Sequence, residues 1–98
     1  MNLINYRKMV TSILVNPLDN LIIFIEDHHN KSMKSVKGKI INETKYMIHL
    51  MTDTHNLISI PKKGGKFIIL SENIKIIITG DLLLGNAKSR SKKKYRKW

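Results

Sequence analysis

The sequence predicts an all-β protein whose centre is an antiparallel barrel of six or seven short strands. Between residues 36 and 70, apolar residues recur at about every second position, which is the period of a strand. Turn-forming residues separate the apolar segments at short intervals, and no segment between them is long enough for a crossover helix. Short strands joined by tight turns are typical of an antiparallel barrel.

A helix is expected to precede the strands, within residues 1–17. Apolar residues at helical spacing form one face there: Met9, Val10, Ile13 and Leu14. Pro17 ends the helix, because proline lacks a backbone donor and restricts the residue before it. Such a short helix is marginal alone and must pack on the protein's own core, on a partner, or on both. We expect Met9, Val10 and Ile13 to contact a partner protein.

The first two strands are predicted from residues 21–25 and 33–41. The first is a continuous apolar run, which favours a strand buried on both faces or paired centrally. Gly38 lies inside the second and indicates a bulge or a sharp bend. A turn at residues 42–45 follows, in which the charges of Glu43 and Lys45 are expected to be solvated.

The remaining strands are predicted in the order 46–51, 56–60, 66–70 and 74–79, with a short closing strand at 82–84. Closure of the barrel would protect the apolar strand edges from pairing with another molecule. The loop at residues 61–65 contains two lysines and two glycines but lacks the nucleotide-binding pattern Gly-x-x-x-x-Gly-Lys-Ser/Thr. Its lysines either contact a nucleic-acid backbone or are solvated.

Composition restricts the classes of function. The chain has 98 residues, with 18 Lys and Arg against 7 Asp and Glu, and a formal net charge of +11, which indicates a polyanion-binding protein. Cysteine is absent, which excludes disulfides and thiol catalysis. The four histidines lack the spacing of a metal site. No signal peptide or membrane span is recognisable, so we expect a cytoplasmic protein.

The last segment, residues 86–98, contains seven basic residues, two aromatic residues and no acid. A segment of this composition is expected to be disordered or partly helical when free. Its cations can neutralise phosphates, while Tyr95 and Trp98 can stack on exposed bases. A solubilising tail or a localisation signal is the alternative.

Three segments together resemble protein component 1 of archaeal ribonuclease P and its eukaryotic relatives in nuclear ribonuclease P and the mitochondrial-RNA-processing ribonuclease. They are residues 38–44, with the Glu43-Thr44 turn; residues 58–67, with a Pro-Lys-x-Gly-x-x-Phe corner; and residues 78–85, with Gly-x-x-Leu-x-Gly. The sequence departs from the family pattern at three places. Ser35 replaces a frequent glycine, Asn42 replaces an acid, and of an Arg-Pro-Glu-Asp-Arg motif after Gly85 only Arg90 is kept.

The resemblance implies an Sm-like, strongly bent antiparallel barrel at residues 18–85, between an N-terminal helix (1–17) and a basic C-terminal tail or helix (86–98). It implies a subunit of the ribonucleoprotein endonuclease that removes the 5′ leader from precursor tRNA. The catalyst there is the RNA with its bound magnesium, so this chain would bind no cofactor and supply no catalytic residue. The implied partners are ribonuclease P RNA, a zinc-ribbon protein subunit, other ribonuclease P proteins and precursor tRNA.

We therefore predict a non-catalytic RNA-binding subunit. The residues expected to contact RNA are basic: Lys37, Lys39, Lys62, Lys63, Lys66, Arg90, Lys92, Lys93 and Arg96. The alternatives are a homo-oligomeric Sm-like RNA chaperone and a protein–protein scaffold with an incidental charge. Light scattering separates the predicted subunit from the chaperone. The subunit would be a monomer or a one-to-one pair with a zinc-ribbon protein, whereas the chaperone ring would be a stable hexamer or heptamer.

Overall fold

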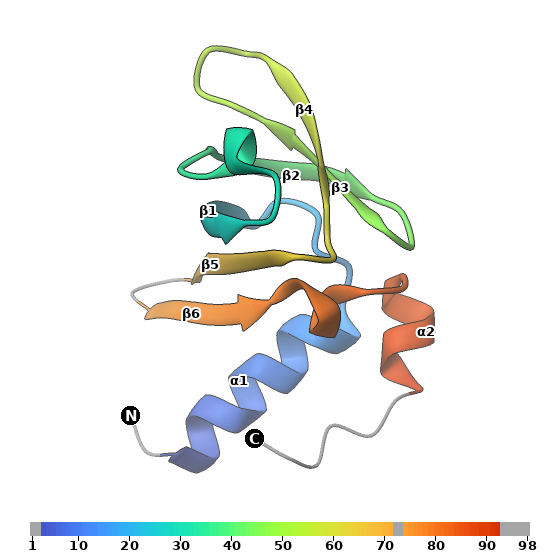
Figure 1. Cartoon of the computed structure of the whole chain (residues 1–98). Coiled ribbons are helices and arrows are strands. Elements are labelled where there is room, and N and C mark those ends of the chain that lie inside the picture. Colours follow the sequence, from blue (N-terminus) through green and yellow to red (C-terminus); the bar gives the residue numbers. More distant parts are fainter. Residues whose placement is uncertain (1–2, 72–73, 93–98) are drawn as a thin grey trace.

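Six antiparallel strands form one bent sheet in the computed structural model, which describes residues 3–71 and 74–92 (Figure 1). The elements are α1 (Leu3–Val15), β1 (Ile22–His28), the 3-10 helix η1 (Lys31–Met33), β2 (Lys37–Glu43), β3 (Met47–Met51), β4 (Leu57–Pro61), β5 (Gly65–Ser71), β6 (Ile74–Thr79), the 3-10 helix η2 (Gly80–Leu83) and α2 (Ala87–Ser91). The predicted all-β class with a helix at its N-terminal end is confirmed.

The strands are hydrogen-bonded in the order β4-β3-β2-β1-β5-β6. Register shifts interrupt the β1–β5 pairing between Ile25 and Asp27, and the β2–β3 pairing between Ile40 and Asn42. Such bulges increase the local bend of a sheet. Among the described residues, β4 and β6 remain the two ends of this order, so the barrel is bent but not closed, contrary to the prediction of closure.

Three local predictions are corrected. Residues 82–84 are not a closing strand, because η2 takes up residues 80–83. Gly80 there lies so close to the backbone carbonyl of Lys62 that no side-chain carbon could fit. The strand predicted from residue 33 begins instead at Lys37, after η1. Of the two alternatives for residues 21–25, central pairing is confirmed, because β1 lies between β2 and β5. Burial on both faces is wrong, since the residues of β1 alternate between buried and partly exposed.

The core lies between one face of the sheet and α1. It consists of buried apolar residues from every strand and from both flanking regions: Val10, Ile13, Leu14, Leu18, Ile23, Ile25, Ile40, Ile48, Leu50, Ile60, Phe67, Ile69, Ile76, Ile78 and Leu83. Figure 1 shows α1 below β6 and α2 beside the C-terminal end of α1. The expectation that the N-terminal helix covers its own core is therefore confirmed.

Candidate nucleic-acid interface

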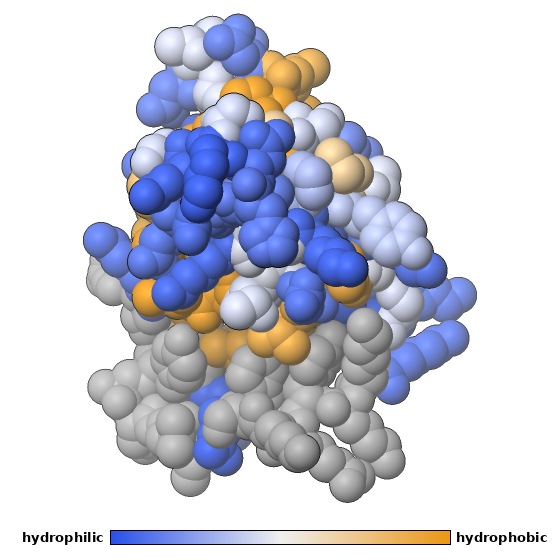
Figure 2. Space-filling view, viewed as in Figure 1, coloured by the Kyte–Doolittle hydropathy of each residue, from blue (hydrophilic) through white to orange (hydrophobic). Residues whose placement is uncertain are grey.

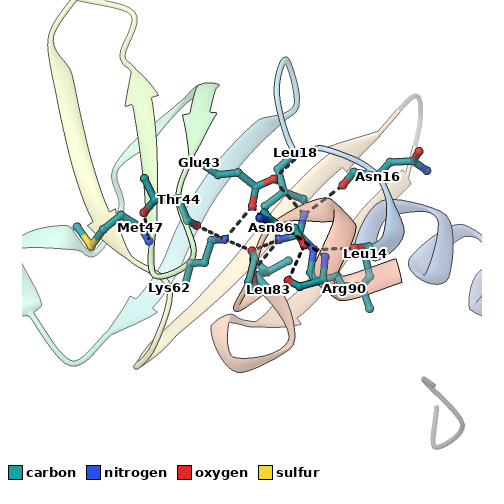
Figure 3. Close-up of polar contacts among 12 residues, drawn as sticks. Leu14, Asn16, Leu18, Glu43, Thr44, Met47, Lys62, Leu83, Asn86 and Arg90 are labelled. Carbon is teal, nitrogen blue, oxygen red and sulfur yellow. Dashed lines mark hydrogen bonds and ion pairs between the residues drawn. The ribbon is translucent and has the colours of Figure 1, made fainter. Parts of the chain in front are cut away.

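Two residues predicted to bind RNA lie in the interior instead. Lys62 and Arg90 are both 0% exposed, and both cations meet the carboxylate of Glu43, whose side chain is 7% exposed (Figure 3). We call these three residues the buried charge cluster. A phosphate could reach neither cation without opening this corner of the protein. The prediction that Lys62 and Arg90 contact RNA is corrected accordingly.

Glu43 accepts hydrogen bonds on both carboxylate oxygens. Its Oε1 lies 2.7 Å from Lys62 Nζ and 2.7 Å from Arg90 Nη1. Its Oε2 lies 3.0 Å from Arg90 Nη2 and 2.9 Å from the backbone N of Leu18. The carboxylate is thus paired and hydrogen-bonded, as a buried charge must be. The expectation that Glu43 is a solvated turn residue is wrong.

Lys62 uses all three of its donors. Besides Glu43, its Nζ donates to the carbonyl oxygens of Thr44 at 2.7 Å and Gly85 at 2.8 Å. Gly85 has a φ of +87°, a left-handed conformation that glycine adopts without strain. This conformation belongs to the turn that presents the Gly85 carbonyl to Lys62. The loop at 61–65 and the segment after η2 are therefore joined through one ammonium group.

Arg90 joins even more distant parts of the chain. Its Nε donates to the carbonyl of Leu14 at 2.6 Å, and its Nη2 donates to the carbonyl of Asn16 at 3.1 Å, at the end of α1. Its Nη1 donates to the carbonyl of Leu83 at 3.0 Å and to that of Gly85. The planar guanidinium, which presents several fixed donors, suits such a multiple contact better than lysine would.

Burial and pairing act in opposite directions on these groups. Burial would raise the pKa of Glu43, but hydrogen bonds from Arg90, Lys62 and the Leu18 amide outweigh it and hold that pKa below its ordinary value. Burial lowers the pKa of Lys62, and the Glu43 carboxylate only partly opposes this. The reason is that one carboxylate serves two cations, and the positive charge of Arg90 adds to the effect on Lys62.

The cluster fixes where the C-terminal segment leaves the domain. Arg90 is on α2, and its partners come from α1, β2 and the segment after η2. Asn86 caps α2 by accepting a hydrogen bond from the Ser89 amide at 2.9 Å. The basic residues that follow α2 therefore start from a defined point beside the end of α1.

The other predicted RNA-binding residues within the described part of the chain are exposed: Lys37, Lys39, Lys63, Lys66 and Lys92. Lys93 and Arg96 lie outside the described residues. Further exposed cations were not predicted as contacts: Arg7, Lys8, Lys31, Lys34, Lys45, Lys75 and Lys88. The described acids that are exposed are fewer: Asp19, Asp27, Asp53 and Asp81. The described surface is therefore strongly cationic.

One face of the molecule is mostly hydrophilic over η1 and the connection from β1 to β2 (Figure 2). A cavity of about 310 Å³ lies where β1 ends near the loop at 61–65, and its lining includes Lys63 and Lys66. Asp27 and Asp81 line the same cavity, so its charge is mixed. The pKa of Asp27 is lowered by a hydrogen bond from the His28 amide and by the nearby charge of Lys31.

The residues predicted to bind a protein partner are occupied by the chain itself. Val10 is 2% exposed and Ile13 is 8% exposed, and both belong to the core. Met9 is partly buried and packs against the same core. Val10 and Ile13 are therefore not available to a partner, which corrects the prediction for these two residues. Met9 is partly exposed, and its contact with a partner stays a prediction.

Among the described histidine and acidic side chains, His28 and His49 form hydrogen bonds within the fold. His28 is buried, with its Nε2 2.9 Å from the carbonyl of Pro61 and its Nδ1 accepting from the Asn30 amide at 3.0 Å. His49 Nδ1 lies 2.7 Å from Ser59 Oγ. Within residues 3–71 and 74–92, no group of three or more such side chains could hold a metal ion. In the same part of the chain, no helix is long and apolar enough to span a membrane.

Comparison with known proteins decides the family. A family model described as ribonuclease P/MRP, subunit p29, matches residues 16–93. The chain belongs to this family. Ribonuclease P protein component 1 of Methanocaldococcus jannaschii is 31% identical over 85 residues, covering 87% of this chain and 90% of that protein. The proteins of the same name from Methanosarcina mazei (32% over 100 residues; 90% and 91% covered) and Methanococcus aeolicus (35% over 88 residues; 87% and 90% covered) are also similar.

The ribonuclease P/MRP subunit p29 match begins after α1 and includes the whole buried charge cluster. The resemblance found in the sequence is thus confirmed, and three residues of its motifs have a structural role. Glu43 belongs to the Glu-Thr turn, Lys62 belongs to the Pro-Lys corner, and Arg90 is the residue kept from the motif after Gly85. These three motif residues, far apart in sequence, meet as one ion-paired group.

Proposed function

We propose that this chain is the RNA-binding protein subunit of a ribonuclease P that removes the 5′ leader from precursor tRNA. The observation that carries the proposal is that the p29 family match spans the sheet, the buried charge cluster and the start of the basic tail. The excess of exposed lysine and arginine over acid supports it, because such a surface attracts the phosphates of RNA.

The proposed role is to fold and stabilise the catalytic RNA. Exposed cations screen the repulsion between phosphates that a compact RNA brings together, so the RNA needs less magnesium to fold. The chemistry of cleavage belongs to the RNA and its bound magnesium, and this chain binds no cofactor. Its partners are ribonuclease P RNA, a zinc-ribbon subunit, the other ribonuclease P proteins and precursor tRNA, in the cytoplasm.

The experiment is reconstitution of the holoenzyme with and without this chain, followed by cleavage of precursor tRNA at a series of magnesium concentrations. With the chain present, half-maximal cleavage is expected at a lower magnesium concentration. The same magnesium dependence in both preparations would contradict the proposal. Leader removal by the chain with magnesium but without RNA would overturn the non-catalytic role.

The tail contribution is tested by removing residues 93–98, which leaves Arg90 and the buried charge cluster intact. We expect weaker binding to ribonuclease P RNA and a smaller salt dependence, since each lost phosphate contact lowers the slope by about 0.7–0.9. A matched control replaces Tyr95 and Trp98 with leucine and keeps every charge, so its salt slope should stay unchanged. An unaltered slope after truncation would exclude tail contacts to phosphate.

A further inference from the structure

The face of the sheet opposite the core carries apolar side chains bordered by lysines. In β1 and β5, the residues between the fully buried positions are only partly buried, and they are not among those packed against the core. Strand register places the outward residues of β2, β1, β5 and β6 in two rows. They are Lys37, Phe24, Ile68 and Ile77 in one row, and Lys39, Ile22, Leu70 and Lys75 in the other.

A depression of about 270 Å³ lies in this face. It is lined by Phe24, Ile68 and Leu70, with Lys37 on β2 and Lys75 on β6 at its two sides. Both lysines are exposed, and neither forms an ion pair with another described residue. Ile77, beside Ile68 in the register, is 52% exposed.

This combination restricts the chemistry of the occupant. Lys37 and Lys75, which form no ion pair within the described part of the chain, favour an anionic occupant. The apolar depression between them, with its aromatic ring, suits a flat, weakly polar group between two negative charges. Unpaired nucleotides offer this arrangement, because a base has a face that can stack and a phosphate on each side. A double helix does not, because its bases are stacked inside it.

We propose that this outer face binds an unpaired stretch of RNA, with one base against Phe24 and neighbouring phosphates on Lys37 and Lys75. The inference rests on the proposed function and names the kind of RNA that this part of the surface takes. It adds Phe24 and Lys75 to the contacts expected from the sequence. It also distinguishes the RNA preference of this face from that of the tail, because the cations of the tail attract phosphate whether or not the bases are paired.

The test measures binding of the full chain to an unpaired RNA of roughly ten nucleotides and to a duplex of the same length. Phe24→Leu keeps an apolar side chain and removes the ring, and should weaken binding to the unpaired RNA about tenfold while leaving the duplex unchanged. Lys75→Gln should lower the salt slope for unpaired RNA by about 0.7. The matched control is Lys34→Gln, which removes another exposed lysine that does not line the depression and should leave the preference for unpaired RNA intact.

A second measurement requires no variant and so does not depend on refolding. Unpaired RNA carrying 5-iodouridine is irradiated on the unmodified chain, and the cross-linked peptide is identified by mass spectrometry. Cross-linking to Phe24 supports the inference. Cross-linking confined to Tyr95 and Trp98 in the tail contradicts it.

The outcomes also distinguish this inference from the function on which it rests. If the chain binds ribonuclease P RNA but Phe24→Leu binds unpaired RNA as well as the wild type, only this inference fails. If Phe24→Leu instead loses a protein subunit and keeps its RNA affinity, the face binds protein and the inference is overturned. If the chain shows no salt-dependent RNA binding at all, both the proposed function and this inference fail.

Discussion

Lys62 and Lys63 are adjacent lysines, yet Lys62 is 0% exposed and Lys63 is exposed at the surface. The difference follows from strand alternation. Ile60 points into the core at the end of β4, and two residues later Lys62 occupies the next inward position, where its amide still donates to the carbonyl of Tyr46. Lys63 falls on the outward side. Position relative to the strand, and not charge, decides which lysine is available to RNA.

The same contrast separates Arg90 from Lys88 on α2. Arg90 is 0% exposed and is surrounded by carbonyl oxygens and Glu43, whereas Lys88 is exposed. A buried cation is tolerated only with a paired and hydrogen-bonded partner. The net charge therefore overestimates the number of cations that a polyanion can reach, because Lys62 and Arg90 are buried and stabilise the fold.

The largest expected effect comes from Glu43→Gln, which removes the one carboxylate that two buried cations share. We expect a loss of about 3–5 kcal/mol in the free energy of unfolding, because Lys62 and Arg90 remain buried without a counter-charge. Urea denaturation measures it. Asp53→Asn, in the exposed β3–β4 turn, is the control and should change stability by less than about 0.5 kcal/mol. Equal stability of the two variants would show that the cluster contributes nothing.

Acid should remove the same interaction reversibly. The pKa of Glu43 in the folded protein is held below its ordinary value of 4.5, so the folded state binds this proton less readily than the unfolded state does. The contribution of Glu43 to the free energy of unfolding is therefore complete at neutral pH, and it is lost as the pH falls through the lowered pKa of the folded state. Denaturation of the wild type at a series of acidic pH values measures this loss of stability. In Glu43→Gln, the part of the pH dependence that comes from protonation of Glu43 should be absent. An identical acid dependence in the two proteins would contradict this assignment.

Replacing each of the two neighbouring lysines with methionine separates stability from binding. Lys62→Met should cost about 1.5–3 kcal/mol of stability, because hydrogen bonds from a charged group to Glu43 and two carbonyls are lost. Lys63→Met should leave stability within about 0.5 kcal/mol. For RNA, the order reverses: only Lys63→Met should lower the salt slope, by about 0.7–0.9. Thermal unfolding and salt titrations give both values, and a lowered slope for folded Lys62→Met would contradict the buried role.

The fold was largely predictable because its signals are local. Period-two alternation, a continuous apolar run at residues 21–25 and turn residues identified the six strands, and residues 74–79 agree with β6 without correction. The 3-10 helix η2 was not predictable, because it depends on the contact between Gly80 and the distant carbonyl of Lys62. Closure was wrongly predicted because pairing between the first and last strands of a sheet depends on its overall bend, which no local pattern specifies.

The site was less predictable. Arg90 and Glu43 are 47 residues apart in sequence, and only the tertiary fold brings them together. One signal was nevertheless present, since Glu43 lies in a segment that carries the family resemblance and Arg90 is the residue kept from the motif after Gly85. Lys62, in turn, continues the inward alternation of Ile60. A charged residue at an inward position of a strand predicts a buried partner of opposite charge. Applied to Lys62, this rule would have predicted a buried ion pair instead of a contact to RNA.

The smallest expected effect concerns Ser35, which lies between η1 and β2. Its φ is +69°, a left-handed conformation that costs a residue with a side chain about 1–2 kcal/mol. Ser35→Gly removes this cost but gives the unfolded chain more freedom, so we expect a net gain of about 0.5–1 kcal/mol. Ser12→Gly, the same substitution within α1, should instead destabilise by about 0.5 kcal/mol, because glycine is the poorer helix former. In thermal unfolding, the melting temperature should therefore rise for Ser35→Gly and fall for Ser12→Gly. A fall for both variants would mean that Ser35 carries no strain.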